Sequence, residues 1–146
     1  MQGIYRKYGL NPTVDYPPCE GFWGIDKVGK PSNIEWFDRF QTRETLGGGY
    51  AGYIADPNEI FTISSRALKE NYSEIITQGQ SYYYFKFKLK NIPDDLIFEY
   101  GEAMPWFDEI GGAIQIKSST EFHLLSNNID ILEKWSLING QWTRIL

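Results

Sequence analysis

The clearest pattern of hydrophobic and polar positions in the chain lies at residues 81–89, SYYYFKFKL. From residue 85 onward, three apolar residues alternate with three lysines: Phe85, Lys86, Phe87, Lys88, Leu89 and Lys90. Strict alternation is the period of a β-strand, whose successive side chains point to opposite faces of a sheet. The pattern therefore predicts a strand with one buried face and one solvated face.

Other short β-compatible runs are found along the chain, at residues 50–54, 60–63, 97–100 and 112–117. The first two are separated by the turn residues Asp56-Pro57-Asn58. Residues 35–40 form a short strand or a helical turn, and residues 65–72 one or two helical turns. Many short strands with few helices predict a β-rich α+β fold with a twisted antiparallel sheet as its core.

The C-terminal region allows two interpretations. Asn128 can cap a short helix through Lys134, or residues 135–138 and 141–144 can form a hairpin around Asn139-Gly140, a sequence that favours tight β-turns. We favour a helix, then a turn, then a strand.

The length of 146 residues favours a single domain covering residues 1–146, because domains cluster near about 100–150 residues. Residues 1–34 are rich in proline and glycine and lack periodicity, which predicts an extended N-terminal segment. Residues 35–146 then form the core.

Composition excludes several classes of function. The net charge of −5 argues against a nucleic-acid partner, because phosphate binding needs clustered Lys and Arg. With one cysteine, Cys19, and one histidine, His123, we expect no internal disulfide and no metal site. Neither a signal peptide nor a membrane span is expected. The run Gly47-Gly48-Gly49 lacks the Lys-Ser/Thr of a phosphate-binding loop and the spacing of a dinucleotide fold.

An ordered set of short motifs carries more information than any of them alone. In chain order they are YPPCEGFWG, WFDRF, GGGYAGYIADP, SRAL, SYYYFKF and GEAMPWFDEIGGAIQ. Their order and spacing, over about residues 16–116, resemble the tuberculosis necrotizing toxin family of NAD glycohydrolases. The resemblance implies a fold like that of this family and of ADP-ribosylating toxins. It also implies hydrolysis of NAD+, and of NADP+ as a second substrate, to ADP-ribose and nicotinamide, with no separate cofactor.

Gln115 matches the family's glutamine and is the central catalytic residue that the resemblance implies. Nicotinamide leaves NAD+ as a neutral ring, so the barrier lies in forming a ribosyl cation rather than in protonating the leaving group. An oriented amide dipole can stabilise such a cation, or hold the ribose hydroxyls or the attacking water, without ionising. The alternative is that Gln115 is a partly buried structural residue of a strand, which caps the edge of the sheet.

Two arginines match the family's motifs. Arg39 in WFDRF is expected to be a site residue that grips the pyrophosphate through paired hydrogen bonds. Arg66 in SRAL is a second phosphate contact or an ordinary surface ion-pair partner.

The loop before Gln115 is expected to bind the nicotinamide ring. Phe107 is the residue that we expect to stack on the cationic ring, with Trp106 packing beneath the loop. Gly111 and Gly112 would let the backbone approach the ligand closely.

Tyrosines and acids complete the candidate site. Tyr53 best fits the family's tyrosine, with Tyr50 as a competitor. The family's strand histidine is absent, because residues 81–87 read SYYYFKF here, and Tyr83 or Tyr84 would take its place. Three acids near the aromatic loop are alternatives to Gln115 for holding the ribose: Glu102, Asp108 and Glu109.

Three classes of function compete: an NAD(P)+ glycohydrolase toxin, an ADP-ribosyltransferase acting on a protein, and a non-enzymatic module that binds through exposed tryptophans. The candidate tryptophans of that module are Trp23, Trp36 and Trp106. The first class implies an effector delivered to the cytosol of a target cell, and a dedicated immunity protein in the producing cell.

Overall fold

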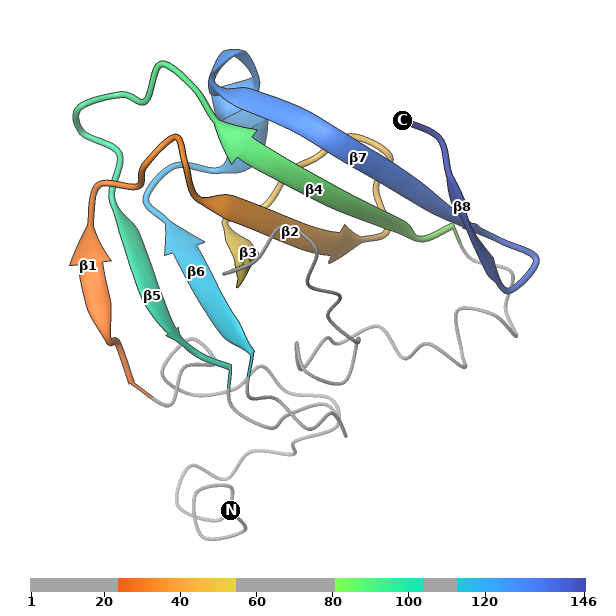
Figure 1. The fold of residues 1–146 in the computed structure, drawn as a ribbon, viewed down its shortest axis with the longest axis horizontal. Helices are drawn as coiled ribbons and strands as arrows, with labels where there is room; N and C mark the ends of the chain where they lie inside the picture. The colour runs from red at the N-terminus through yellow and green to blue at the C-terminus, as the bar shows by residue number, and fades with distance from the viewer. Residues whose placement is uncertain (1–23, 55–80, 104–112) are drawn as a thin grey trace, which may run out of the picture.

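Eight antiparallel strands in a single sheet make up most of the computed structural model, which describes residues 24–54, 81–103 and 113–146 (Figure 1). The order across the sheet is β1-β5-β6-β3-β2-β4-β7-β8. The strands are β1 (Lys27–Gly29), β2 (Trp36–Gln41), β3 (Tyr50–Ile54), β4 (Tyr83–Leu89), β5 (Phe98–Glu102), β6 (Ile114–Ser118), β7 (Ile129–Ile138) and β8 (Gln141–Arg144). One short 3-10 helix, η3 (Phe122–Asn128), precedes β7. The β-rich antiparallel fold predicted from the sequence is confirmed.

The sheet curls strongly, and its inner face encloses the main core. Figure 1 shows β1, β5 and β6 running steeply across the direction of β2, β4 and β7. As a result, the ring of Phe37 on β2 lies 5.2 Å from that of Phe98 on β5, although β3 and β6 separate these strands in the sheet. Helix η3 packs onto the same core through Phe122, whose ring is 5.3 Å from that of Phe87.

Strand β4 shows the alternation that its sequence predicts, with one correction. Phe85, Phe87 and Leu89 are buried in the core. The expectation of a solvated lysine row is wrong at Lys86, which is only 7% exposed and lies 3.5 Å from Glu133 of β7. The outer face is covered at this point, so the ammonium group is buried with an ionic partner.

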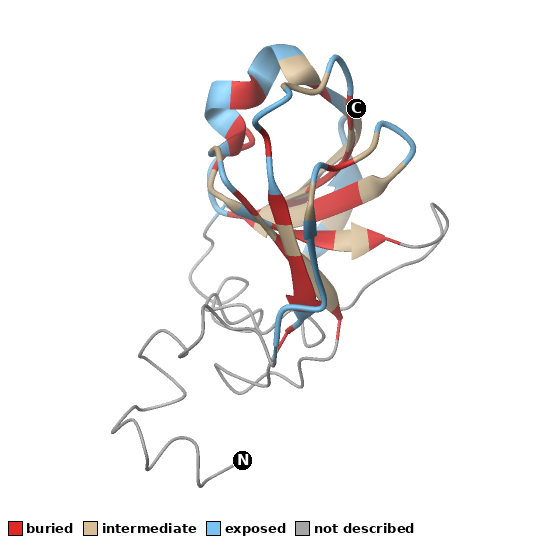
Figure 2. Ribbon diagram, turned by 90° about the vertical axis from the view of Figure 1, so that its left-hand side faces the viewer, coloured by how far each residue is buried: buried red, intermediate tan, exposed pale blue. Residues whose placement is uncertain are grey.

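The outer face of the sheet carries a second, smaller cluster. Tyr82 and Leu137 are buried there, and Phe40 and Trp142 pack against them. The Phe40 ring lies 5.9 Å from the Trp142 ring in an edge-on arrangement. Part of the outer face of the sheet is therefore covered as well, and Figure 2 shows how buried and intermediate segments alternate in the sheet.

The predicted helix from Asn128 to Lys134 is wrong, because these residues begin β7. The free edge of β4 pairs with β7 from Leu89↔Ile129 to Tyr83↔Ser136, which satisfies the backbone groups of both strands. The alternative hairpin is confirmed. Its turn residues Asn139 and Gly140 have φ of 50° and 75°, the left-handed pair that a tight hairpin turn requires.

The remaining sequence predictions have mixed outcomes. Residues 36–41 form a strand, not a helical turn, and residues 27–29 of the predicted N-terminal segment pair with β5. The runs at 60–63 and 65–72 lie outside the described residues, and the single-domain assignment stays a prediction. In the part of the chain that the structure describes, no helix has the length and apolar character needed to span a membrane.

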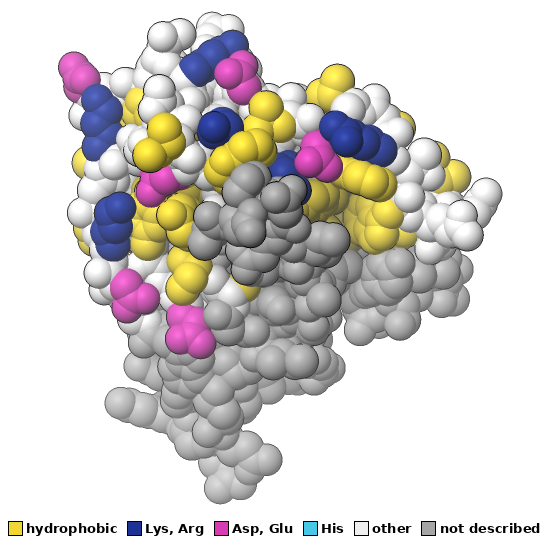
Figure 3. Space-filling view, viewed as in Figure 1, with side chains coloured by type: hydrophobic (Ala, Val, Ile, Leu, Met, Phe, Trp, Pro, Cys, Tyr) yellow, Lys and Arg dark blue, Asp and Glu magenta, His cyan; other side chains and the backbone are white. Residues whose placement is uncertain are grey.

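Charged side chains are mixed on the surface. On the face shown in Figure 3, basic and acidic groups are interspersed with apolar ones and do not gather into a basic stripe. Lys90, for example, lies 2.9 Å from Asp130.

Candidate functional site

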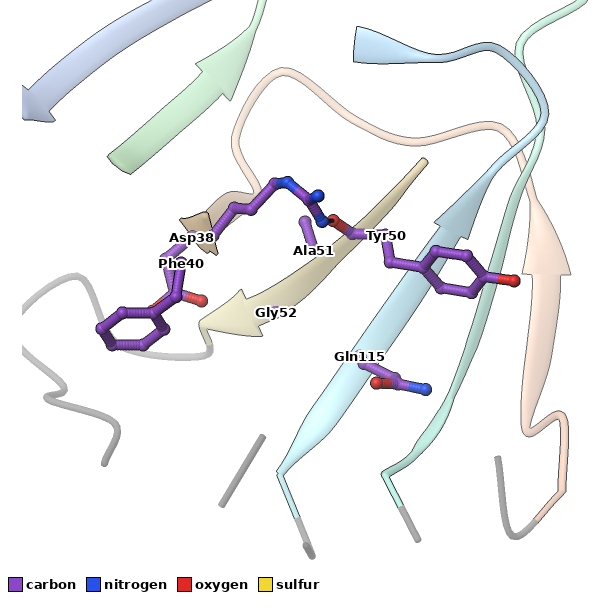
Figure 4. A pocket seen from close by; sticks show the side chains of 7 residues that line it. Asp38, Phe40, Tyr50, Ala51, Gly52 and Gln115 are labelled. Carbon is purple, nitrogen blue, oxygen red and sulfur yellow. Dashed lines mark hydrogen bonds between the residues drawn. The ribbon is translucent and has the colours of Figure 1, made fainter. Parts of the chain in front are cut away.

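An open hollow lies over the adjacent strands β2, β3 and β6, with about 330 Å³ of space when the solvent at its mouth is included (Figure 4). It is lined by Asp38, Arg39, Phe40, Tyr50, Ala51, Gly52 and Gln115. Three of these residues, Arg39, Tyr50 and Gln115, were singled out from the sequence. Residues that lie more than 60 positions apart in the chain therefore meet at one place on the sheet.

Gly52 forms the middle of the hollow because it has no side chain between two polar neighbours. It pairs with Asp38 on one side and with Gln115 on the other, so that the side chains of Asp38 and Gln115 project from the same face. Adjacent strands are about 4.8 Å apart, which places the two backbones about 9–10 Å from each other.

Gln115 is half-buried and has glycines as its cross-strand neighbours on both sides. Gly52 is its partner on β3 and Gly101 its partner on β5. Within the described residues the amide group makes no side-chain hydrogen bond, and Figure 4 shows it extending from β6 beside Gly52. The amide is thus exposed to the hollow on a rigid central strand.

The two candidate tyrosines lie in different places. The side chain of Tyr50 is 37% exposed at the start of β3, and its ring extends over β6 in Figure 4. Tyr53 packs on the inner face, with its ring 6.1 Å from Phe37 and 5.7 Å from Tyr100. The structure therefore brings Tyr50, and not Tyr53, to the hollow.

Arg39 belongs to the lining, but its guanidinium group turns to the face opposite Gln115. Its Nε donates to Oε1 of Gln41 at 3.0 Å, and Nη1 donates to the carbonyl oxygen of Tyr50 at 2.7 Å. Gln41 in turn donates to the carbonyl oxygens of Arg43 and Thr45. These contacts hold the loop between β2 and β3 in place. The phosphate-binding role expected of Arg39 stays a prediction.

Gly48 in this loop provides a test of that anchoring role. Its φ is +76°, and a Cβ added there would lie 2.5 Å from Nη2 of Arg39. Because a left-handed conformation costs an L-residue about 1–2 kcal/mol, we expect Gly48→Ala to lower the free energy of unfolding by that amount. Urea titration measures the change. Gly29→Ala is the matched control, since nothing lies within 4 Å of its added Cβ; equal stability of the two variants would contradict the prediction.

Asp38 is the lining residue that the sequence analysis missed. Its side chain is 0% exposed, and Oη of Tyr84 donates to Oδ2 at 2.6 Å. An acid in the middle of the aromatic run WFDRF was the available signal, since carboxylates are almost never fully buried unless they are paired. Of the two tyrosines considered in place of the missing histidine, Tyr84 therefore lies near the hollow. Tyr83 lies on the inner face, under the Lys134 ammonium group at 5.5 Å.

The remaining candidate site residues lie away from the hollow or outside the described residues. Glu102 is exposed at the end of β5, paired with Ile114, and His123 is 3.3 Å from Glu121 on the surface. Among the described residues no group of three His, Cys, Asp or Glu is arranged to hold a metal ion. Eight candidate residues fall outside the described residues: Trp23, Arg66, Trp106, Phe107, Asp108, Glu109, Gly111 and Gly112.

Comparison with known proteins gives a limited result. The chain matches no protein-family model and no curated protein sequence. Among solved structures it is similar to tuberculosis necrotizing toxin (TNT) complexed with its immunity factor IFT, with 14% sequence identity and a TM-score of 0.47. The match covers 88% of this chain and 54% of that chain, so this chain spans about half the length of the solved one. A likeness of this size identifies neither a family nor a shared site.

Proposed function

We propose that the chain hydrolyses NAD+, and NADP+ as a second substrate, at the bond between nicotinamide and ribose. One observation carries the proposal: Gln115 and the exposed Tyr50 ring line one hollow on the same sheet face. A polar amide and an aromatic surface are groups that can stabilise a cationic ribosyl pyridinium.

The chemistry needs little from the protein besides positioning and charge stabilisation. When the C1′–N bond breaks, its electron pair returns to the pyridinium ring, which leaves as neutral nicotinamide. Water then bonds to C1′ and releases one proton, giving ADP-ribose. Since no strong acid is required, preorganised dipoles near C1′ are the main contribution expected of the site, and Gln115 supplies one.

The hollow is open to solvent, so the nicotinamide and its ribose would lie against the sheet surface, and the remainder of NAD+ would extend beyond the hollow. The exposed Tyr50 ring offers a flat surface for the charged pyridinium ring.

The direct test is incubation of the purified chain with NAD+ and with NADP+, followed by chromatography of the products. We expect nicotinamide and ADP-ribose in equal amounts from NAD+. Complete absence of nicotinamide release would reject the proposal.

The two alternatives predict different outcomes in the same experiment. A transferase would label an added protein with the ADP-ribose of labelled NAD+ and would depend on an acid such as Glu102, whereas a hydrolase retains full turnover in Glu102→Gln. A non-enzymatic module would show no rise in melting temperature as NAD+ is added, because only a ligand that binds the native state stabilises it.

A chain with this activity would deplete NAD+ in the cell that makes it. The proposal therefore includes delivery to the cytosol of a target cell and an immunity protein that covers the hollow. High-yield production of the fully active chain in a host without such a protein would contradict this part.

A further inference from the structure

The hollow lies where strands β2 and β3 separate. The pairing of β2 with β3 ends at Asp38↔Gly52, whereas β3 stays paired with β6 as far as Tyr50↔Lys117. At the start of β3 the sheet ladder therefore continues on the β6 side and ends on the β2 side. This start carries Tyr50, whose exposed ring lines the hollow.

A side chain of β2 takes the place of the ladder at this point. Nη1 of Arg39 donates to the carbonyl oxygen of Tyr50 at 2.7 Å and so links the two strands beyond the last pair. We propose that Arg39 is a positioning residue, which fixes the start of β3 and with it the Tyr50 ring against which the charged pyridinium ring would lie. This role rests on the proposed function and deepens it, because it assigns Arg39 to recognition of the ring instead of the phosphates.

Gln41 fixes the direction of the guanidinium group. The residue is buried, and its Oε1 accepts hydrogen bonds from Nε of Arg39 at 3.0 Å and from the backbone N–H of Gly47 at 3.2 Å. Its Nε2 donates to the carbonyl oxygens of Arg43 and Thr45, both at 2.7 Å. A buried amide whose oxygen and nitrogen are both bonded has one orientation, so Gln41 holds the guanidinium in place.

The loop between β2 and β3 packs against the guanidinium from another side. Gly48 has a φ of +76°, and a Cβ added there would lie 2.5 Å from Nη2 of Arg39. The loop itself is held by the backbone N–H groups of Ser118 and Phe122, which donate to the carbonyl oxygens of Gly49 and Gly48 at 2.7 and 2.8 Å. The guanidinium is therefore packed between a fixed loop and the start of β3.

A positioning role and a phosphate clamp use different donors and act on different parts of the ligand. Two of the five N–H donors of the Arg39 guanidinium bond to Gln41 and to the carbonyl oxygen of Tyr50. The Nε–H is one of the pair of donors that grips a phosphate side-on, and here Gln41 accepts its hydrogen bond. A clamp acts only on a ligand with phosphates, whereas Tyr50 acts on the ring of every ligand that carries the charged pyridinium.

The test compares two substrates in Arg39→Gln. NAD+ carries the charged ring and the pyrophosphate, whereas nicotinamide riboside carries the ring and the ribose without a phosphate. We expect kcat/KM for nicotinamide release to fall about two- to fivefold for both substrates, the size of an exposed contact between a cation and an aromatic ring. Arg144→Gln is the matched control, since Arg144 is exposed on β8, and it should keep both values. A clearly larger loss for NAD+ than for nicotinamide riboside would identify a phosphate clamp and overturn the inference.

A double-mutant cycle separates positioning through Tyr50 from a merely structural role. Tyr50→Leu removes the aromatic ring and should lower kcat/KM by at least as much as Arg39→Gln does. If Arg39 acts through this ring, the double variant loses no more than Tyr50→Leu alone, whereas losses that multiply would overturn the inference. A residue that only stabilises the fold would lower the melting temperature of Arg39→Gln and leave kcat/KM of the folded protein unchanged, which would also overturn it.

Gly48→Ala replaces Arg39→Gln if the latter unfolds at the assay temperature. Its Cβ displaces the guanidinium without removing a donor, so the same equal loss for both substrates is expected. If the wild type releases no nicotinamide, the proposed function fails, and calorimetric Kd values for NAD+ and nicotinamide riboside in the four proteins of the cycle decide the role of Arg39. Independent losses of affinity in that cycle, or a wild type that binds neither ligand, would then reject the role.

Discussion

Gln115→Ala is expected to release nicotinamide from NAD+ about 10²–10³-fold more slowly than the wild type, the loss found when one preorganised dipole is removed from an active site. The amide lies on the central strand β6 between two glycines, so alanine removes the dipole and leaves the backbone pairing unchanged. The effect should fall mainly on kcat, because a group that acts on the developing cation contributes little to binding of the ground state. Initial rates over a range of NAD+ concentrations measure both parameters.

Gln141→Ala is the matched control for this substitution. Gln141 is also a strand glutamine, but it is exposed on the edge strand β8. It should retain full activity and the wild-type melting temperature. Equal activity of Gln115→Ala and Gln141→Ala would contradict a catalytic role for the Gln115 amide and would indicate that Gln115 is a structural residue.

Phe37→Ala is expected to lower the free energy of unfolding by about 3–5 kcal/mol, the usual cost of removing a large aromatic residue from a core. Phe37 is fully buried, and its ring contacts those of Tyr53, Phe87 and Phe98. No neighbour can fill the cavity by a small movement, because the contacts come from three different strands. Urea denaturation followed by tryptophan fluorescence measures the loss.

Val28→Ala is the corresponding surface control, because Val28 is 60% exposed on β1. Its effect should remain within about 0.5 kcal/mol. A loss below about 1 kcal/mol for Phe37→Ala would contradict the assignment of Phe37 to the centre of the core.

The strands that could be predicted from the sequence are those whose patterns are local. The run at residues 50–54 is β3 to the residue, and the Phe-Lys alternation marks β4 correctly. The turn at Asn139-Gly140 was also recognisable, since its φ angles are a property of the two residues themselves.

Features set by pairing between distant strands could not be predicted. The sequence predicts a helix for the first half of β7, because the partner strand β4, which supplies the hydrogen bonds, lies 40 to 53 residues earlier in the chain. The burial of Lys86 likewise depends on Glu133 across the sheet.

The candidate site was predicted in part for the same reason. Gln115 and Tyr50 were recognised by motif, but the choice between Tyr50 and Tyr53 depends on which face each occupies, and this follows from the register with β6. Asp38 could not be assigned to the lining of the hollow from the sequence, because its position opposite Gly52 follows only from the β2–β3 pairing.

The lengths of the outermost strands have a consequence for behaviour at high concentration. In the described part of the chain the sheet ends on one side at β1, with three residues, and on the other at β8, with four. A longer, flatter edge strand would present a row of unpaired backbone N–H and C=O groups, with which a strand of a second molecule could pair. Such short edge strands, each with a cationic side chain at Lys27 or Arg144, offer few unpaired backbone groups for self-association.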